Sequence, residues 1–249
     1  MTLFMHAFQP DLSKLMRFAT RERLLPPGGD LGYALHVALS ASFGAAAPKP
    51  FVWCPPGTRS GGTGGRLLCY SRTSLPELIG RAEAFAEPTV SALLDLSTAD
   101  SKAMPEVYPE ASRLGFRVRL RPVIRTGRAR DGTGGRERDA FIDGKSGTEH
   151  TNGRTGCYLR WLDERLVAGG ARLEQSTLDS FMLTRLMTRD RSGDKSRRDA
   201  PTGPDAVASG TLVIKDPPQF AALLGRGIGR FRAFGFGMLL LSPPAWASR

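Results

Sequence analysis

The chain has 249 residues, of which 41% are hydrophobic, and this composition excludes a disordered protein and fits one large domain or two small ones. It carries 35 lysines and arginines against 24 aspartates and glutamates, which gives a net charge of +11. A protein this basic usually binds a polyanion, although a GC-rich genome, which raises the content of arginine, glycine and alanine together, would also enrich the chain in arginine.

The first half of the chain predicts the element order β-α-β-β-α-β. The expected strands are 2–8, 49–54, 66–71 and 90–96, and the expected helices are 31–43 and 74–85. Ser74 and Glu77 have the spacing of a capping box at the start of the second helix. This order is typical of a ferredoxin-like domain.

The second half repeats this order after a proline-containing linker at 99–112. Its expected strands are 116–125, 171–184, 206–214 and 236–241, its expected helices are 157–168 and 217–224, and polar loops fill 126–155 and 185–202. We therefore predict an α+β protein of two tandem ferredoxin-like, RNA-recognition-like domains with antiparallel sheets, at 1–104 and 105–249.

The cysteines and the N-terminal residues indicate in which cellular compartment the protein works. Cys54, Cys69 and Cys157 lack the spacing of a zinc site, and their odd number argues against a disulfide scaffold, so we interpret them as buried or incidental thiols. The first residues lack the pattern of a signal peptide, and no apolar run approaches the roughly 20 residues of a membrane span. We expect a soluble, cytoplasmic protein that makes no membrane contact, so its anionic partner would be a nucleic acid.

The most specific pattern is the glycine-rich segment 225–241, GRGIGRFRAFGFGMLLL. Its glycines, among them Gly227 and Gly229, let the backbone bend sharply and approach other groups closely. Three arginines in the same segment indicate phosphate binding, whereas a plain turn from a helix into a strand is the alternative. They are Arg226, Arg230 and Arg232. The pattern is not a P-loop, and its place at a strand entry disfavours dinucleotide binding.

A second pattern lies in the expected first helix. Leu31, Leu35, Ala38 and Leu39 share one helical face, and Tyr33, His36 and Ser40 share the opposite face. We therefore expect Tyr33 and His36 to point away from the core, although a single histidine is more often a surface residue than a functional one. Beside RNA, a histidine can take the proton of a 2′-hydroxyl or protonate the departing 5′-oxygen, and arginines can neutralise the transition state. This chemistry needs no metal or other cofactor, and we expect none.

The third pattern is the alternation of apolar and basic residues in 116–125. Period 2 places Arg117, Arg119 and Arg121 on one side of a strand, and Arg125 and Arg128 continue the basic run. Such a ridge suits the phosphates of an RNA stem, and a solvated face of an edge strand is an equal alternative.

Together these residues resemble the CasE-type CRISPR RNA-processing endoribonucleases. The segment GIGRFRAFGFGMLLL is similar to the family's C-terminal loop and last strand, and Tyr33-x-x-His36 to its catalytic pair. FRVRLRPVIRT resembles the strand that opens the family's second domain, and the order of the motifs agrees along nearly the whole chain.

The resemblance implies cleavage of CRISPR precursor RNA at repeat hairpins, with a 2′,3′-cyclic phosphate product. It implies that the enzyme, monomeric alone, stays on the 3′ stem-loop of the mature crRNA and joins the other subunits of an interference complex. His36 would be the general acid or base and Tyr33 its partner. The subtype stays open between a type I-E-like enzyme and a type IV relative, in which arginines share or replace the role of the histidine. Arg21 and Arg23 are the candidates for that role.

Two other functions remain alternatives at this point. One is a crRNA-hairpin-binding subunit with the same fold and no turnover. The other is a basic structural protein of a ribonucleoprotein without preference for a hairpin.

Overall fold

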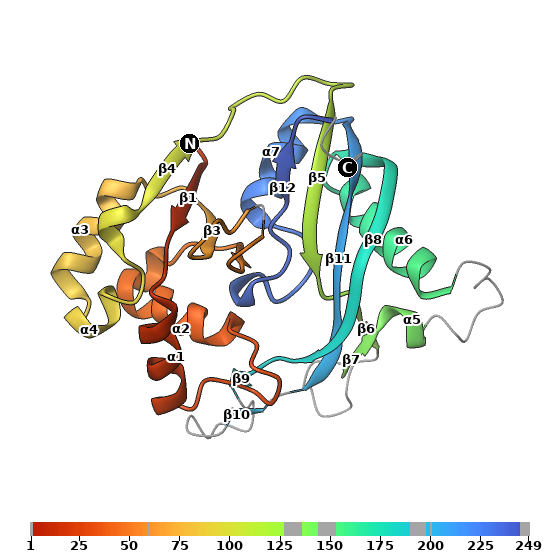
Figure 1. The fold of residues 1–249 in the computed structure, drawn as a ribbon. Coiled ribbons are helices and arrows are strands. Elements are labelled where there is room, and N and C mark those ends of the chain that lie inside the picture. The colour runs from red at the N-terminus through yellow and green to blue at the C-terminus, as the bar shows by residue number, and fades with distance from the viewer. Residues whose placement is uncertain are drawn as a thin grey trace.

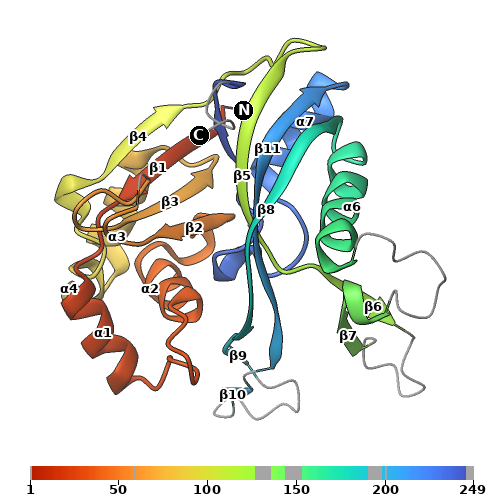
Figure 2. The ribbon, with the colours of Figure 1, turned by 45° about the vertical axis from the view of Figure 1, so that its right-hand side comes forward.

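The computed structural model describes residues 2–58, 60–126, 136–143, 153–189, 198–199 and 201–244. They form two four-stranded antiparallel sheets that lie beside each other, with helices of the first half on one side of the molecule and α6 on the other, while α7 lies behind the second sheet near β12 (Figures 1 and 2). Among the described residues, no helix is long and apolar enough to cross a membrane.

The first sheet has the strand order β2-β3-β1-β4. Its elements are β1 (Phe4–Phe8), α2 (Gly32–Phe43), β2 (Phe51–Cys54), β3 (Arg66–Ser71), α3 (Leu75–Phe85) and β4 (Asp100–Ala103). The Ser74 hydroxyl accepts a hydrogen bond from the Glu77 backbone N–H, as the capping spacing predicts. The order of these six elements and of the four strands is that of a ferredoxin-like fold, as predicted.

Two expectations for this half are wrong. The apolar run 90–96 is not a strand, because Pro88 begins the short helix α4 (Pro88–Ser91), and Leu93 and Leu94 fill the core from the turns that follow it. The last strand is instead β4, whose polar sequence gives no apolar alternation. The structure also has a helix that we did not predict, α1 (Leu12–Arg21), which Asp11 caps and which lies between β1 and α2.

The second sheet has the order β12-β5-β11-β8. Read from β8 to β12, and with the strands of each half numbered along the chain, this is the same order as in the first sheet: second, third, first, fourth. Its elements are β5 (Arg113–Leu120), α6 (Gly153–Val167), β8 (Ala171–Arg185), β11 (Thr202–Ile214), α7 (Pro217–Arg226) and β12 (Leu240–Ser242). The hairpin of β6 (Val123–Thr126) and β7 (Arg136–Asp139), followed by α5 (Ala140–Asp143), stands between β5 and α6. The short pair β9 (Thr188–Arg189) and β10 (Arg198–Asp199) extends the β8–β11 ribbon.

Two strands are shorter than expected. The strand predicted at 116–125 breaks at Arg121 and Pro122, and its second part pairs with β7 instead of the large sheet. The last strand begins only at Leu240, because Gly235 and Gly237 have positive φ angles that a regular strand does not accommodate.

Three apolar clusters hold these layers together. One lies between the first sheet and its helices, and a second lies between the second sheet and α6 and α7. The third joins the two halves, because Tyr70 and Met104 of the first half pack against Met238. The Tyr70 hydroxyl also donates to the Leu239 carbonyl at 3.0 Å. The segment before β12 is therefore packed against both halves of the protein.

Candidate functional site

Helix α2 presents His36 to an aromatic ring of the glycine-rich segment. The ring of Phe234 lies edge-on to His36, with centroids 4.9 Å apart, and is stacked on Tyr33 at 5.8 Å. The Ser40 hydroxyl approaches His36 Nδ1 at 3.5 Å. Phe234 thus joins the two residues of the Tyr-x-x-His pattern, and the role of this phenylalanine was not evident from the sequence.

The placement of Tyr33 corrects the two-face interpretation of this helix. Tyr33 is only 5% exposed and belongs to the first apolar core, whereas His36 is half-buried. The reason is that α2 has contacts nearly all round, with the first core on one side and the Phe234 ring on another. His36 therefore stands at the edge of the core, and Tyr33 lies inside it.

The glycine-rich segment makes close backbone contacts that side chains would block. Gly227 has a φ of 75°, and a Cβ there would meet Pro50 at 2.9 Å. Gly229 has a φ of 72° and packs on the Trp161 ring. The Ile228 backbone N–H donates to the Gly237 carbonyl at 2.8 Å, so the segment closes on itself before β12.

A hollow of about 510 Å³ opens on this segment. Its lining includes four cations and no acidic residue: Lys49, Arg226, Arg230 and Arg232. Phe234 also lines the hollow, and its ring touches His36. The hollow thus gathers three predicted arginines and adds Lys49, which we had placed at the start of a strand, while the predicted His36 is connected to it through Phe234.

Two of these arginines are held in place by their neighbours. Arg232, the first residue of the 3-10 helix η4 (Arg232–Phe234), donates from Nη1 to the Arg226 carbonyl at 2.6 Å, across the turn that precedes η4. Arg230 Nε lies 2.7 Å from Glu137 Oε1. The side chain of Arg226, at the end of α7, is exposed.

The arginines near the end of β5 do not form an exposed ridge. Arg117 is exposed and lies 3.5 Å from Asp179, but the side chain of Arg119 is only 21% exposed and contacts both Asp30 and Asp205. Arg121 is 3% exposed, and it donates to the carbonyls of Thr184 and Pro201. The ridge interpretation is thus wrong for Arg121, because β5 ends at Leu120 and the next side chain turns inward.

The net pKa shift has opposite directions for Arg119 and Arg121. For Arg119 burial opposes the charge, but hydrogen bonds and charge interactions with Asp205 and Asp30 outweigh it and raise the pKa. For Arg121 burial prevails and lowers the pKa. The Arg121 cation also lies over the rings of Phe231 at 5.2 Å and Phe236 at 5.9 Å.

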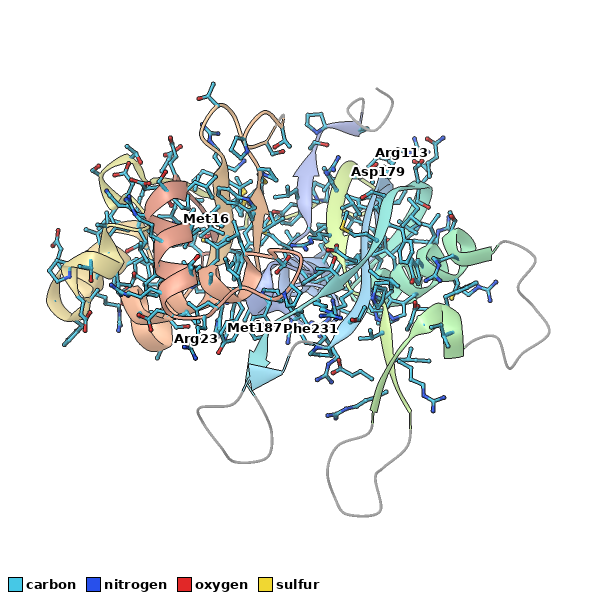
Figure 3. The ribbon with its side chains drawn as sticks, turned by 60° about the horizontal axis from the view of Figure 1, so that its bottom comes forward. Met16, Arg23, Arg113, Asp179, Met187 and Phe231 are labelled. Carbon is cyan, nitrogen blue, oxygen red and sulfur yellow. The ribbon has the colours of Figure 1, made fainter. Side chains whose placement is uncertain are left out.

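The remaining candidate arginines lie apart from this cluster in the sequence. Arg21 is the last residue of α1 and pairs with Glu22 at 2.9 Å, and Arg23 follows in an exposed loop with a φ of 53°. Figure 3 shows Arg23, Met187 and Phe231 along the same edge of the molecule, with Arg113 and Asp179 at the other end of the second half. Arg125 is exposed on β6, and Arg128 lies outside the described residues.

The surroundings of Cys54, Cys69 and His6 indicate a structural role for these residues. Cys54 and Cys69 are buried, as expected, and burial raises the pKa of both thiols, that of Cys54 to about 11. His6 is fully buried between Ser101 and the Thr73 carbonyl, and burial lowers its pKa. Within the described part of the chain, no group of three or more His, Cys, Asp or Glu side chains is arranged to hold a metal ion.

Comparison with known proteins gives a family and several structural relatives. A model of the family described as CRISPR associated protein matches residues 12–243. No curated protein matches the chain by sequence. Thermus thermophilus Cse3 bound to an RNA representing a pre-cleavage complex has a TM-score of 0.63 and 19% identity, covering 98% of this chain and 100% of that one.

Two further structures show the same fold at similar identity. Cas6e from Escherichia coli has a TM-score of 0.53 and 18% identity, covering 98% of this chain and 100% of its own. A chain of a CRISPR RNA-guided surveillance complex, pre-nicking, also has a TM-score of 0.53 and 18% identity, with 96% and 99% covered. Because the family match spans nearly the whole sequence, the chain belongs to the CRISPR associated protein family.

Proposed function

We propose that this protein is an endoribonuclease that cuts CRISPR precursor RNA at the repeat hairpin, without a metal, and keeps the product stem-loop. The observation that carries the proposal is Phe234, which lines the four-cation hollow and whose ring touches His36. A phosphodiester that enters the hollow would be neutralised by the cations and would lie next to an imidazole. The structural relatives include Cse3 bound to RNA, which supports RNA as the ligand.

The proposed reaction is an internal transfer at phosphorus. A base takes the proton of the 2′-hydroxyl, and the oxyanion attacks the adjacent phosphorus. The bond from phosphorus to the 5′-oxygen breaks, and an acid protonates that oxygen, which leaves a 2′,3′-cyclic phosphate and a 5′-hydroxyl. His36 serves as the acid or the base, because a histidine side chain can either accept or donate a proton in such a reaction. Arg230 and Arg232 stabilise the negative charge of the transition state.

Tyr33 has a different proposed role from His36. Because the tyrosine is buried and stacked on Phe234, we propose that it fixes the ring against which His36 rests. The exposed cations Arg21, Arg23, Arg117, Arg125 and Arg226 are proposed to contact phosphates of the hairpin. Arg119 and Arg121 are engaged inside the protein, so we do not place them on the RNA. Arg117 is paired with Asp179 on the open face of the second sheet, so its proposed contact is peripheral and does not reach the cleavage site.

The proposal extends to the partners, the location and the domain boundary of the protein. The likeness to a chain of a surveillance complex supports a role as a subunit beside other CRISPR proteins. Precursor transcripts are made in the cytoplasm, where we place the protein. We set the boundary of its two domains at 104/105, just after β4 ends at Ala103.

A hairpin-binding subunit without turnover remains the second candidate, because the burial of Tyr33 leaves His36 without an exposed tyrosine beside it. Incubation of the protein with its repeat hairpin in excess chelator separates the two. We expect one cut and a 2′,3′-cyclic phosphate end, and binding without product would instead select the second candidate.

Substitution assigns the chemical role. We expect His36→Ala to bind the hairpin and to cut it at least about 100-fold more slowly, the usual loss for a general acid or base. If His36→Ala cut at the normal rate and Arg23→Ala did not, the arginine would carry the reaction. A requirement for magnesium in the wild-type reaction would contradict the metal-independent mechanism.

A further inference from the structure

Arg119 connects three parts of the protein that are distant in sequence. Its Nη2 atom lies 2.6 Å from Asp205 Oδ2 on β11 and 2.7 Å from Asp30 Oδ2, just before α2. Its guanidinium carbon lies 4.3 Å from the centre of the Phe236 ring, and its backbone carbonyl accepts from the Gly237 N–H at 2.7 Å. One residue of β5 thus holds the start of α2 and the glycine-rich segment together.

Asp30 divides its two carboxylate oxygens between the two halves of the protein. Oδ1 accepts from the Gly32 backbone N–H at 2.9 Å, in the first turn of α2, and Oδ2 accepts from Arg119. The Asp30 side chain is 8% exposed, so water screens this ion pair less than a surface pair. Any change in the position of Arg119 is therefore transmitted to the first turn of α2.

The first turn of α2 is also in direct contact with the segment that carries Phe234. A Cβ atom on Gly32 would overlap the Phe234 carbonyl oxygen, so the two backbones touch without a side chain between them. Tyr33 and His36 follow on the same helix, and both rest on the Phe234 ring. Asp30 and Arg119 stand where this contact is made.

We propose that Asp30 and Arg119 are positioning residues, which set His36 against Phe234 and the cationic hollow by joining α2 to β5. The proposal rests on the proposed nuclease function. Reaction rates depend steeply on the placement of an acid or base, and a displacement of about 1 Å can cost about 100-fold in rate. The pair acts through the placement of His36, and neither residue touches the RNA.

Asp30→Asn is the informative variant, because the amide oxygen can still accept from the Gly32 N–H while the charge that holds Arg119 is removed. Asp205 continues to pair with Arg119, so no cation is left buried alone. The matched control is Asp179→Asn, which removes the carboxylate that pairs with Arg117 on the same sheet. Within the described residues the polar partners of Asp179 are Arg117 and Ser209, and both belong to the second sheet. Figure 3 shows Asp179 at the end of the molecule away from Phe231.

Two measurements test the pair. Single-turnover cleavage of the repeat hairpin should slow by about 10- to 100-fold in Asp30→Asn, with the hairpin Kd changed less than about twofold, and should stay at the wild-type rate in Asp179→Asn. Hydrogen exchange should speed up in peptides 32–43 and 229–237 of Asp30→Asn alone.

The inference is overturned if Asp30→Asn leaves both rate and exchange unchanged, if Asp179→Asn changes them equally, or if the rate falls only in proportion to hairpin affinity. A wild-type protein that leaves the hairpin uncut would refute the proposed function instead, and the exchange comparison would still decide whether the pair joins α2 to the segment.

Discussion

Gly32 is the point at which α2 and the glycine-rich segment touch, and its lack of a side chain is a requirement of the site. A Cβ there would collide with the Phe234 carbonyl and lie 2.8 Å from Asp30 Oδ1, so either the helix or the segment must move. We expect Gly32→Ala to lower the free energy of unfolding by about 1–3 kcal/mol, the usual cost of overpacking, and to slow hairpin cleavage. Urea unfolding and single-turnover assays measure the two effects.

Gly80 provides the control for this substitution. It lies within α3, and a Cβ there would meet no atom within 4 Å. Gly80→Ala should raise stability by up to about 1 kcal/mol, because alanine favours a helix over glycine, and should leave cleavage unchanged. Equal behaviour of the two variants would show that the contact at Gly32 has no special role.

Single residues also show where inference from the sequence ends. The alternation of β5 correctly placed Phe116, Val118 and Leu120 in the core. It did not reveal that Arg119 is covered by Asp30 and Asp205, because those carboxylates lie 89 and 86 residues away along the chain. A pattern of period 2 gives the face of a strand, and the contacts on that face depend on tertiary structure.

Among the helices and strands, those that depend on neighbouring residues in the sequence were predicted best. Helix α3 follows from its serine cap, and β3 has the predicted bounds because its apolar residues Leu67–Tyr70 lie between two polar ones in a central strand. Strand β4 and helix α1 were missed for different reasons. Strand β4 is polar, so only its pairing with β1 identifies it. Helix α1 is amphipathic, with Leu15 and Ala19 on its buried face, and this periodic pattern was present in the sequence but was not used.

His6 makes the β1–β4 contact sensitive to pH. Its two ring nitrogens lie 2.9 Å from the Ser101 hydroxyl on β4 and 3.0 Å from the Thr73 carbonyl, which fits a neutral ring with the proton on Nε2. Burial lowers its pKa below the unfolded value of about 6.5, so the unfolded state binds the proton more readily. Stability should therefore be independent of this group above pH of about 6.5 and should fall as the pH drops from there to the folded pKa.

Between those two pKa values the free energy of unfolding should fall by at most about 1.4 kcal/mol for each unit by which the pH is lowered. Urea unfolding of wild type and His6→Gln at several pH values between 7.5 and 5 would isolate it, since carboxylates titrate in both proteins. If the difference between the two proteins did not change with pH, the buried histidine would not be the cause.

The β8–β11 ribbon is anchored where it leaves the sheet. Arg121 donates to the carbonyls of Thr184 on β8 and Pro201, one residue before β11, while Asp205 accepts from the Thr184 hydroxyl. We expect Arg121→Ala to lower the free energy of unfolding by about 2–4 kcal/mol, because the buried Arg121 side chain loses its packing and two partly buried carbonyls lose a charged donor. Arg113→Ala removes an exposed ion pair with Glu174 and should cost less than about 1 kcal/mol. Comparable losses in urea unfolding would contradict an anchoring role for Arg121.

At the scale of the whole molecule, the net charge of +11 matters through its distribution. Arginines of the open face of the second sheet are paired with carboxylates, as in Arg113–Glu174 and Arg117–Asp179. The hollow at the glycine-rich segment is lined by four cations, of which Arg230 is paired with Glu137, and its lining includes no acidic residue of the described part of the chain. RNA should therefore be attracted to the hollow in preference to the open sheet face.

Salt dependence distinguishes a local phosphate contact from a general effect of charge. Each phosphate contact that a nucleic-acid-binding protein makes adds about 0.7–0.9 to the steepness of log affinity against log salt concentration, because a counterion is released. Arg226→Gln and Arg113→Gln each remove one positive charge, the first at the hollow and the second at the far end of the second sheet (Figure 3). We expect the steepness for the repeat hairpin to fall by about 0.7–0.9 in the first variant only. An equal fall in both would mean that the hairpin responds to the net charge of the protein, and a fall in Arg113→Gln alone would place the RNA on the open sheet face.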